Sequence, residues 1–510
     1  MRAALFVLLV LGQCRASHDD DDGGVDVYCS GGPSPDASPN LWPIDSSPTL
    51  RHEADYKTTG RLYTALHPAA NASYPVLHLY GTPYEMGYAQ GSLLGERCLS
   101  FWRAFWGYLL EQAGGASPAT EAALNASLAA VEASSAPYVP AAMTQELRGL
   151  AAATGAEYRW VLWIHLFPET AGGHCSMFGA WGAATAGGAM GGRLLQMRAL
   201  DYITADFLSH NHALTVYHPD PGTAGDGGDG GGDGGDGGGD GGDGGGGDGG
   251  DGGGGDGVPF VNVGFVGTVH AVTGLSDAPL GLCEIGVSNP DSSFGPQRSG
   301  QGIPFNFLLR QLLQHSRSVA DARRAISAAN RTVDLVLGLG GDPDRGADPA
   351  VGPTEPAAAA AAAALPWPAP TFTGVRYSAD RATFYGDGPS MLPVNASWHA
   401  PIESVVYQGM DWLCPGWTRK LGEQLRAHHG ALTAEVAIRH VNPIVQTGDL
   451  HVAIYEVAKR VLYVSFSAGS DAPAGAPRKA YDRPYIRFDA AALFAVAPPH
   501  SQRGGAGQAA

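Results

Sequence analysis

The sequence is poor in cysteine, in long apolar runs and in positive charge, and each shortage argues against one kind of structure or partner. No stretch after the first residues reaches the ~20 apolar residues that a transmembrane helix needs. The 31 Lys and Arg residues are outnumbered by 49 Asp and Glu residues and form no basic cluster, so nothing suggests a nucleic-acid partner. The six cysteines become five once the first 16 residues are removed, and an odd number excludes complete pairing within one chain.

The first residues predict a secretory signal peptide, residues 1–16. Met1 and Arg2 precede a short apolar run from Ala3 to Leu11, and small residues stand at Cys14 and Ala16. Glycan acceptor sequons occur at Asn71, Asn125, Asn330 and Asn395. We therefore expect a secreted protein or one delivered to a lysosome-like lumen, with no transmembrane segment.

The five remaining cysteines are expected to include at least one unpaired thiol. They are Cys29, Cys98, Cys175, Cys283 and Cys414. In an oxidising compartment a leftover thiol is a candidate for reactivity. Cys98, Cys283 or Cys414 could form a disulfide with Cys29, and the sequence does not determine the connectivity.

Two low-complexity segments interrupt the chain. Residues 225–257 consist of glycine and aspartate. Without their nine aspartates the net charge of the chain would be −9 instead of −18. These repeats lack the apolar residue with which calcium-binding Gly-Asp repeats build a β-helix core, so a disordered loop is expected. Residues 346–370 form an Ala/Pro-rich surface insertion.

The rest of the chain divides at Cys175. Residues 17–59, rich in Asp, Pro, Ser and Gly, predict a poorly ordered lead-in, and residues 60–174 a mostly helical amino-terminal part. Residues 175–510 alternate short strands with helices. Helices followed by strands, twice over, predict sheets sandwiched between helical layers.

The stretch GGHCSMFGAWGAATAGG, residues 172–188, places Cys175 at the start of a predicted hairpin. A turn around Gly188 would bring Arg198 and Asp201 back beside Cys175. Strict alternation along a strand would put Arg198 and Asp201 on opposite faces, so this prediction assumes a bulge or a strand end near Asp201.

An arginine beside a thiol favours the nucleophilic thiolate, but the cluster contains no obvious base. His174 is a poor candidate because adjacent strand residues point to opposite faces. Cleavage of the His174–Cys175 bond would give Cys175 a free α-amino group, whose ordinary pKa of about 7.7–8.0 suits it to accept the thiol proton.

Several motifs together resemble one known group. They are Cys175-Ser176, Trp181-Gly182, Arg198-x-x-Asp201, GTPYEMGYAQG, YQGMDWLCPGW and QTGDLHVAIYE. In combination they resemble the N-terminal nucleophile (Ntn) hydrolases of the choloylglycine hydrolase and penicillin acyltransferase type, and among these the secreted eukaryotic acid-ceramidase-like proteins. The resemblance extends from about Leu77 to Phe494.

The resemblance implies an α+β fold, a four-layer αββα sandwich, made as a precursor that cuts itself between His174 and Cys175. It implies Cys175 as nucleophile, its amine as base, and Arg198 and Asp201 as groups that position the thiol and amine. The two fragments would stay associated, and no cofactor or metal is implied.

The resemblance also implies an oxyanion-binding asparagine, and the matching residue here is Asp334. An ionised carboxylate would repel the oxyanion, whereas a protonated one could donate a hydrogen bond. Ser288 and Asn289 are weaker candidates for substrate or oxyanion contacts. Asp449 and His451 are compatible with a metal site or with a structural role.

The expected function is hydrolysis of a linear amide, an N-acyl lipid being one such substrate, through an acyl-thioester. Two alternatives remain open. One is an acyltransferase of the same fold, in which an amine takes the acyl group. The other is a catalytically silent secreted binding protein in which Cys175 is structural.

Overall fold

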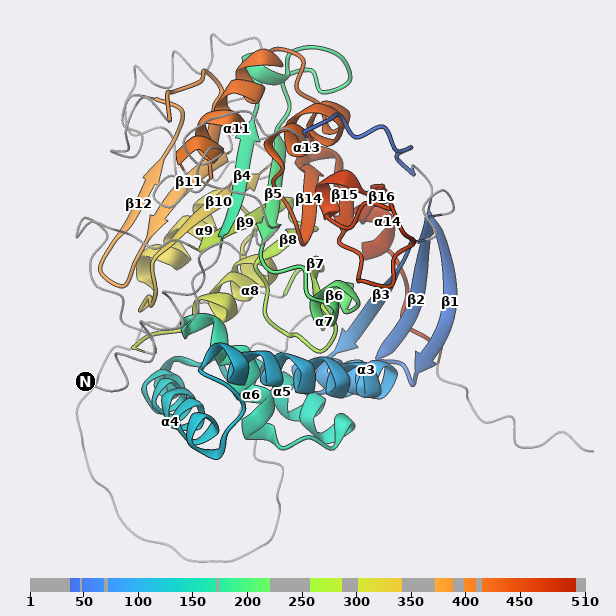
Figure 1. Cartoon of the computed structure of the whole chain (residues 1–510), viewed down its shortest axis with the longest axis vertical. Coiled ribbons are helices and arrows are strands. Elements are labelled where there is room, and N and C mark those ends of the chain that lie inside the picture. The colour runs from blue at the N-terminus through green and yellow to red at the C-terminus, as the bar shows by residue number, and fades with distance from the viewer. Residues whose placement is uncertain are drawn as a thin grey trace, which may run out of the picture.

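The structure, a computed structural model, describes most of the chain and has an α+β architecture (Figure 1). The described residues are 37–45, 48–67, 72–170, 174–220, 257–286, 301–341, 372–388, 399–409 and 415–500. The signal peptide, most of the lead-in and nearly all of both low-complexity insertions lie outside these ranges.

Two β-sheets form the centre of the molecule. The larger has ten strands in the order β1-β2-β3-β6-β7-β8-β9-β10-β11-β12. These strands are β1 (Thr49–Tyr56), β2 (Gly60–His67), β3 (Ala72–Gly81), β6 (His212–Pro219), β7 (Phe260–Phe265), β8 (Thr273–Ser276), β9 (Leu280–Gly286), β10 (Leu335–Gly341), β11 (Phe372–Tyr377) and β12 (Ala382–Tyr385).

The smaller sheet has six strands in the order β13-β4-β5-β14-β15-β16. They are β13 (Val405–Gln408), β4 (His174–Ala180), β5 (Leu195–Asp201), β14 (His451–Glu456), β15 (Val461–Phe466) and β16 (Ile486–Asp489). Neighbouring strands pair antiparallel in both sheets, except for β3 and β6, which run parallel.

Helices cover the outer face of each sheet. The described α-helices of four or more residues are α3 (Pro83–Gln112), α4 (Pro118–Ser135), α5 (Ala141–Thr154), α6 (Tyr158–Leu166), α7 (Asp206–Ser209), α8 (Phe305–His315), α9 (Val319–Ala328), α11 (Pro415–Ala427), α13 (Asn442–Val445) and α14 (Ala490–Phe494). In the view of Figure 1, α3 to α6 gather below the sheets, and α11 and α13 lie towards the top.

Alternation along the strands divides the apolar side chains of the sheets among three core clusters, and a fourth, smaller cluster lies among α3, α4 and the turn after α6. In β10, Leu335, Leu337 and Leu339 pack towards the helices α3, α5, α6, α8 and α9, whereas Val336 packs between the sheets. The third cluster lies between the six-stranded sheet and the helices α11, α12 (Ala434–Val436) and α13. These three cores separate four layers, which confirms the predicted αββα sandwich.

The helical layer depends on two glycines where α3 crosses α5. A Cβ atom at Gly87 would lie 1.9 Å from the carbonyl oxygen of Glu146, and one at Gly149 would lie 2.1 Å from that of Tyr84. Any larger side chain would therefore collide with backbone, so glycine sets the closeness of this crossing. The helix α3 begins within the GTPYEMGYAQG motif, where Thr82 and Glu85 form a capping box.

Strands β1 and β2 lie where no strands were predicted, in 17–59 and at the start of 60–174. Most of their residues are exposed or half-buried, so their sequences TLRHEADY and GRLYTALH lack an apolar face. The edge strand β1 pairs with β2, and β2 pairs with β3, so backbone hydrogen bonds rather than an apolar face hold these two strands in the sheet.

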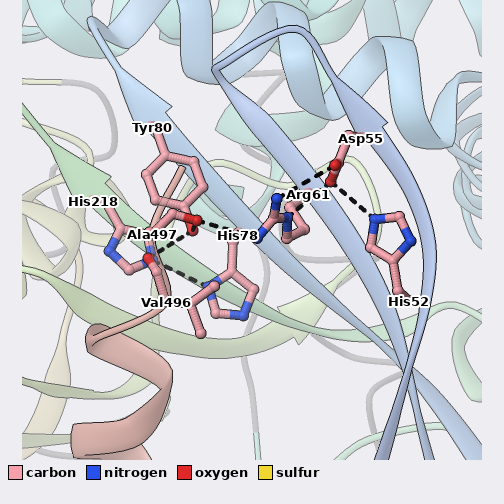
Figure 2. A network of polar contacts seen from close by, with 8 residues as sticks. All are labelled: His52, Asp55, Arg61, His78, Tyr80, His218, Val496 and Ala497. Atoms are coloured by element: carbon pink, nitrogen blue, oxygen red, sulfur yellow. Dashed lines mark hydrogen bonds and ion pairs between the residues drawn. The ribbon is translucent and has the colours of Figure 1, made fainter. Parts of the chain in front are cut away.

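A network of polar contacts fastens the carboxyl-terminal end to this edge (Figure 2). The Tyr80 hydroxyl donates to the carbonyl oxygen of Val496 at 2.9 Å, and Arg61 Nη1 donates to that of Ala497 at 3.3 Å. The Tyr80 ring stacks on His218, with ring centroids 4.4 Å apart. The last described residues are thereby attached to β2 and β3.

Candidate active site

The site is built on the hairpin of β4 and β5, as predicted. Cys175 pairs with Leu200, and the pairing continues without interruption from His174 opposite Asp201 to Ala180 opposite Leu195. Between the strands, the positive φ of 61° at Gly188 is a conformation that glycine adopts without strain. A short local connection therefore brings Arg198 next to Cys175.

Arg198 joins the thiol to a buried carboxylate. Its Nη2 atom donates to Cys175 Sγ at 3.3 Å and to Glu284 Oε2 at 3.2 Å, and its Nε atom donates to the Glu284 carbonyl oxygen at 3.2 Å. Cys175 and Arg198 share the face of β4 and β5 that packs against the ten-stranded sheet, from which β9 supplies Glu284. The prediction that Arg198 contacts the thiol is confirmed.

A third group holds Arg198 from the other side. His451 Nε2 lies 3.0 Å from Arg198 Nη1 and 3.2 Å from the Thr273 hydroxyl. Because arginine can only donate, His451 Nε2 accepts this hydrogen bond and the imidazole is neutral. Burial, with Arg198 adding to it, lowers the pKa of His451 well below its usual value. His451 therefore orients Arg198, and its Nε2 atom is occupied.

Asp201 lies on the opposite face of the sheet as the last residue of β5, so of the two expected irregularities the structure has the strand end and not the bulge. Its carboxylate accepts hydrogen bonds from the backbone nitrogens of Gly448 at 2.6 Å and Asp449 at 3.0 Å and from the Thr447 hydroxyl at 2.8 Å. Burial first, and then the nearby Asp449, raise the pKa of Asp201 to about 6. Asp201 thus pairs across the hairpin with His174, at the bond predicted to be cut.

The thiol is protonated in this uncut chain. Burial raises the pKa of Cys175 to about 12, Arg198 opposes the shift, and the carboxylates of Glu284 and Asp201 add to it. The guanidinium of Arg198 was expected to favour the thiolate, but the effect of burial on the thiol pKa is larger. A base positioned at the thiol is needed before it can react at neutral pH.

A cavity of about 190 Å³ opens beside the thiol. Cys175, Arg198, Glu284 and Asp334 line it together with a largely apolar wall. The wall includes Phe101, Phe105, Ile164, Phe167, Leu200, Leu208, Phe265, Phe305 and Leu450. A nucleophile at the edge of an apolar cavity with few polar groups is the usual arrangement of a small-molecule site.

Asp334 immediately precedes β10 and is 5% exposed. Its Oδ1 atom has no hydrogen-bond partner among the described residues. Burial raises the pKa of Asp334 to about 6, although Arg376 opposes the shift. The carboxyl group is therefore neutral in mildly acidic solution and can then donate a hydrogen bond into the cavity.

Sequence reasoning missed Glu284, which lies in the apolar stretch LGLCEIG of β9. A single carboxylate inside an apolar strand was the available signal, because such a charge is buried only with a partner. Burial raises the pKa of Glu284, and its ion pair with Arg198 opposes that shift.

Several predicted residues lie elsewhere. Ser288, Asn289, Asn71, Asn395, Cys29 and Cys414 are outside the described residues. Asn125 is half-buried on α4 and Asn330 is exposed after α9. Cys98 and Cys283 are buried and free, as is Cys175.

Two features are absent from the described ranges. No three His, Cys, Asp or Glu side chains there are grouped closely enough to bind a metal ion. None of the helices in this part of the chain is long and apolar enough to cross a bilayer.

Similar proteins were found among curated sequences, whereas no family model matches the chain. Protein dcd1A of Dictyostelium discoideum is 27% identical over 479 residues, covering 89% of this chain and 92% of that protein. Protein dcd1B of the same organism is 28% identical over 471 residues, covering 86% and 78% respectively.

Solved structures give weaker likenesses. A Caenorhabditis elegans N-acylethanolamine-hydrolyzing acid amidase ortholog is 11% identical with a TM-score of 0.32, covering 55% of this chain and 92% of its own. Penicillin V acylase from Agrobacterium tumefaciens has the same identity and TM-score over 62% and 86%. A mutant conjugated bile acid hydrolase from Clostridium perfringens is 9% identical with a TM-score of 0.30 over 62% and 96%.

Proposed function

We propose that the chain is the precursor of a self-processing N-terminal-cysteine amidohydrolase. The observation that carries this proposal is the 3.3 Å contact between Arg198 Nη2 and Cys175 Sγ at the edge of the apolar cavity. A structural cysteine would need neither a buried cation at its sulfur nor access to a cavity. The substrate is a linear amide with an apolar acyl group, a class that includes N-acyl lipids.

Activation in this proposal is hydrolysis of the His174–Cys175 peptide bond. Water adds across the bond, so that His174 gains a carboxylate and Cys175 gains an α-amino group. The new amine begins β4, where pairing with β5 holds it close to the thiol of the same residue. With an ordinary pKa of about 7.7–8.0 the amine can accept the thiol proton near neutral pH.

Catalysis then follows from the same groups. The thiol proton passes to the amine, and the sulfur attacks the carbonyl carbon of the amide. The C–N bond breaks as the departing nitrogen takes a proton from the ammonium group, and an acyl-thioester remains. Water, deprotonated by the amine, cleaves the thioester and restores the thiol.

Two residues support these steps without bonding covalently to substrate. Arg198 stabilises the developing thiolate, since its Nη2 atom already lies at the sulfur. A protonated Asp334 can donate a hydrogen bond to the oxyanion, so activity needs Asp334 to keep its proton while the amine has lost its own. The uncharged form is required because a carboxylate would repel the oxyanion.

The test is the amino-terminal sequence and mass of the purified protein and of two cysteine variants. The wild type is expected to yield a fragment beginning Cys-Ser-Met-Phe, and Cys175→Ala is expected to stay uncut, folded and inactive. Cys283→Ala is the matched control, because this thiol is also free and buried and burial likewise raises its pKa to about 12. Normal cleavage in Cys175→Ala, or loss of cleavage in both variants, would contradict the proposal.

A further inference from the structure

The wall of the cavity beside Cys175 is a continuous row of phenylalanine rings. The ring of Phe101 stacks on Phe265 with centroids 5.9 Å apart and on Phe105 with centroids 6.1 Å apart. Phe105 meets Phe167 edge to face at 5.3 Å. All four rings line the cavity and come from α3, from β7 and from the turn after α6.

A second layer supports this row from behind. Phe207 of α7 contacts both Phe101 and Phe105, with ring centroids 6.4 and 6.0 Å away, and Tyr108 contacts Phe207 at 5.5 Å. Phe101 is buried, whereas Phe105 and Phe207 are half-buried, and a ring that moves away from the cavity must find space among these neighbours. The row therefore sets the size of what the cavity accepts.

The volume of the cavity gives the number of acyl carbon atoms that it can hold. A cavity of ~150 Å³ lined by apolar side chains holds benzene, which corresponds to about 25 Å³ per carbon. At that ratio the about 190 Å³ of this cavity accommodates roughly seven or eight carbons. A sixteen-carbon chain needs about 400 Å³ on the same scale, about twice the space available.

We propose that the site selects amides with a compact apolar acyl group, either one aromatic ring or a chain of about six to eight carbons. Long-chain acyl groups are excluded by the row of rings. This inference rests on the proposed amidohydrolase function, since Cys175, Arg198 and the four rings line one cavity. It narrows the substrate class, because ordinary long-chain N-acyl lipids fall outside it.

Binding of free carboxylic acids separates the size of the cavity from its chemistry. The uncut Cys175→Ala protein is titrated calorimetrically with phenylacetate, octanoate and palmitate, each below its micelle concentration. Without a size limit palmitate would bind most tightly, because each additional buried methylene strengthens binding about fourfold. We expect palmitate to bind at least tenfold more weakly than octanoate, and equal or tighter palmitate binding would overturn the inference.

Turnover of amide substrates by the wild type is the second test. The probes are phenylacetyl, octanoyl and palmitoyl amides of aminomethylcoumarin, compared by kcat/KM, with a tenfold preference expected for the two compact groups. Absence of turnover with size-selective binding would refute the proposed function and leave the size limit standing. Turnover that is best for palmitoyl would refute the size limit and support the function.

Variants of α3 test whether the rings set the limit. Phe105→Ala removes a ring from the row and is expected to relax the discrimination against palmitate by at least fivefold, and Phe105→Leu by less. Trp106→Ala is the matched control, because this neighbour is absent from the cavity lining and instead stacks on Trp163 at 6.4 Å. Unchanged discrimination in both folded Phe105 variants would show that the row does not select for size.

Discussion

Replacing Glu284 by glutamine is expected to make the Cys175 thiol more acidic. The carboxylate lies 3.2 Å from the Arg198 Nη2 atom that also contacts the sulfur at 3.3 Å, so sulfur and carboxylate oxygen are at most 6.5 Å apart. At an effective dielectric constant of ~20, repulsion over that distance costs about 2.5 kcal/mol. Glutamine keeps the hydrogen-bonding oxygen and removes the charge, which lowers the thiol pKa by about 2 units.

The assay is the rate at which iodoacetamide alkylates Cys175, followed by peptide mass spectrometry between pH 6 and 10. A pKa lower by about 2 units raises the thiolate fraction about 100-fold, and the reduced nucleophilicity of the more acidic thiol cuts the gain to about tenfold. Mass spectrometry distinguishes Cys175 from the buried thiols of Cys98 and Cys283 because each lies in its own peptide.

Glu146→Gln is the control for this experiment. Glu146 is also a buried carboxylate 3.2 Å from an arginine, Arg310, but it lies in the helical layer away from the cavity lining. Its replacement is expected to leave the pH profile of Cys175 alkylation unchanged. Equal rates in wild type and Glu284→Gln, or the same acceleration in both variants, would refute the electrostatic reasoning.

Two further predictions concern stability. Because the pKa of Asp334 is raised from 3.8 to about 6, its contribution to folding stability is complete below about pH 4 and is lost as the pH rises through 6. Asp334→Asn should therefore shrink the difference in unfolding free energy between pH 4 and pH 7, as measured with urea; an unchanged difference would contradict this. Gly87→Ala should cost about 1–3 kcal/mol in the same assay, since its Cβ would lie 1.9 Å from the Glu146 carbonyl oxygen. Gly95→Ala, also on α3, has 3.8 Å of clearance and should be neutral or stabilising, so equal losses would refute the packing argument.

The sequence predicted the hairpin that carries the site but not its exact register. A hairpin centred on Gly188 would pair Cys175 with Asp201, whereas the structure pairs Cys175 with Leu200, and Arg198, two residues before Leu200, therefore shares the face of the thiol. The observed register places Asp201 on the other face, as the last residue of β5.

The rest of the site depends on contacts between distant segments. Glu284 contacts Arg198 because the two sheets pack face to face. Asp201 accepts hydrogen bonds from residues 447–449 because β14, which follows them, pairs with β5. No period or spacing within one segment encodes such packing. Strands β1 and β2 were not predicted because most of their residues are exposed or half-buried, so neither strand needs the apolar face that identifies a strand in a sequence.

The parallel pairing of β3 with β6 has a consequence for the protein after the proposed cut at Cys175. Strands β1 to β3 belong to the piece before the cut, and β6 and the following strands of the same sheet belong to the piece after it. The cut product would thus be a heterodimer whose two pieces share one continuous sheet and core. The hydrogen bonds of Tyr80 with Val496 and of Arg61 with Ala497 would also join the two pieces. Such a molecule unfolds by dissociation, so its refolding would depend on protein concentration, whereas that of the uncut precursor would not.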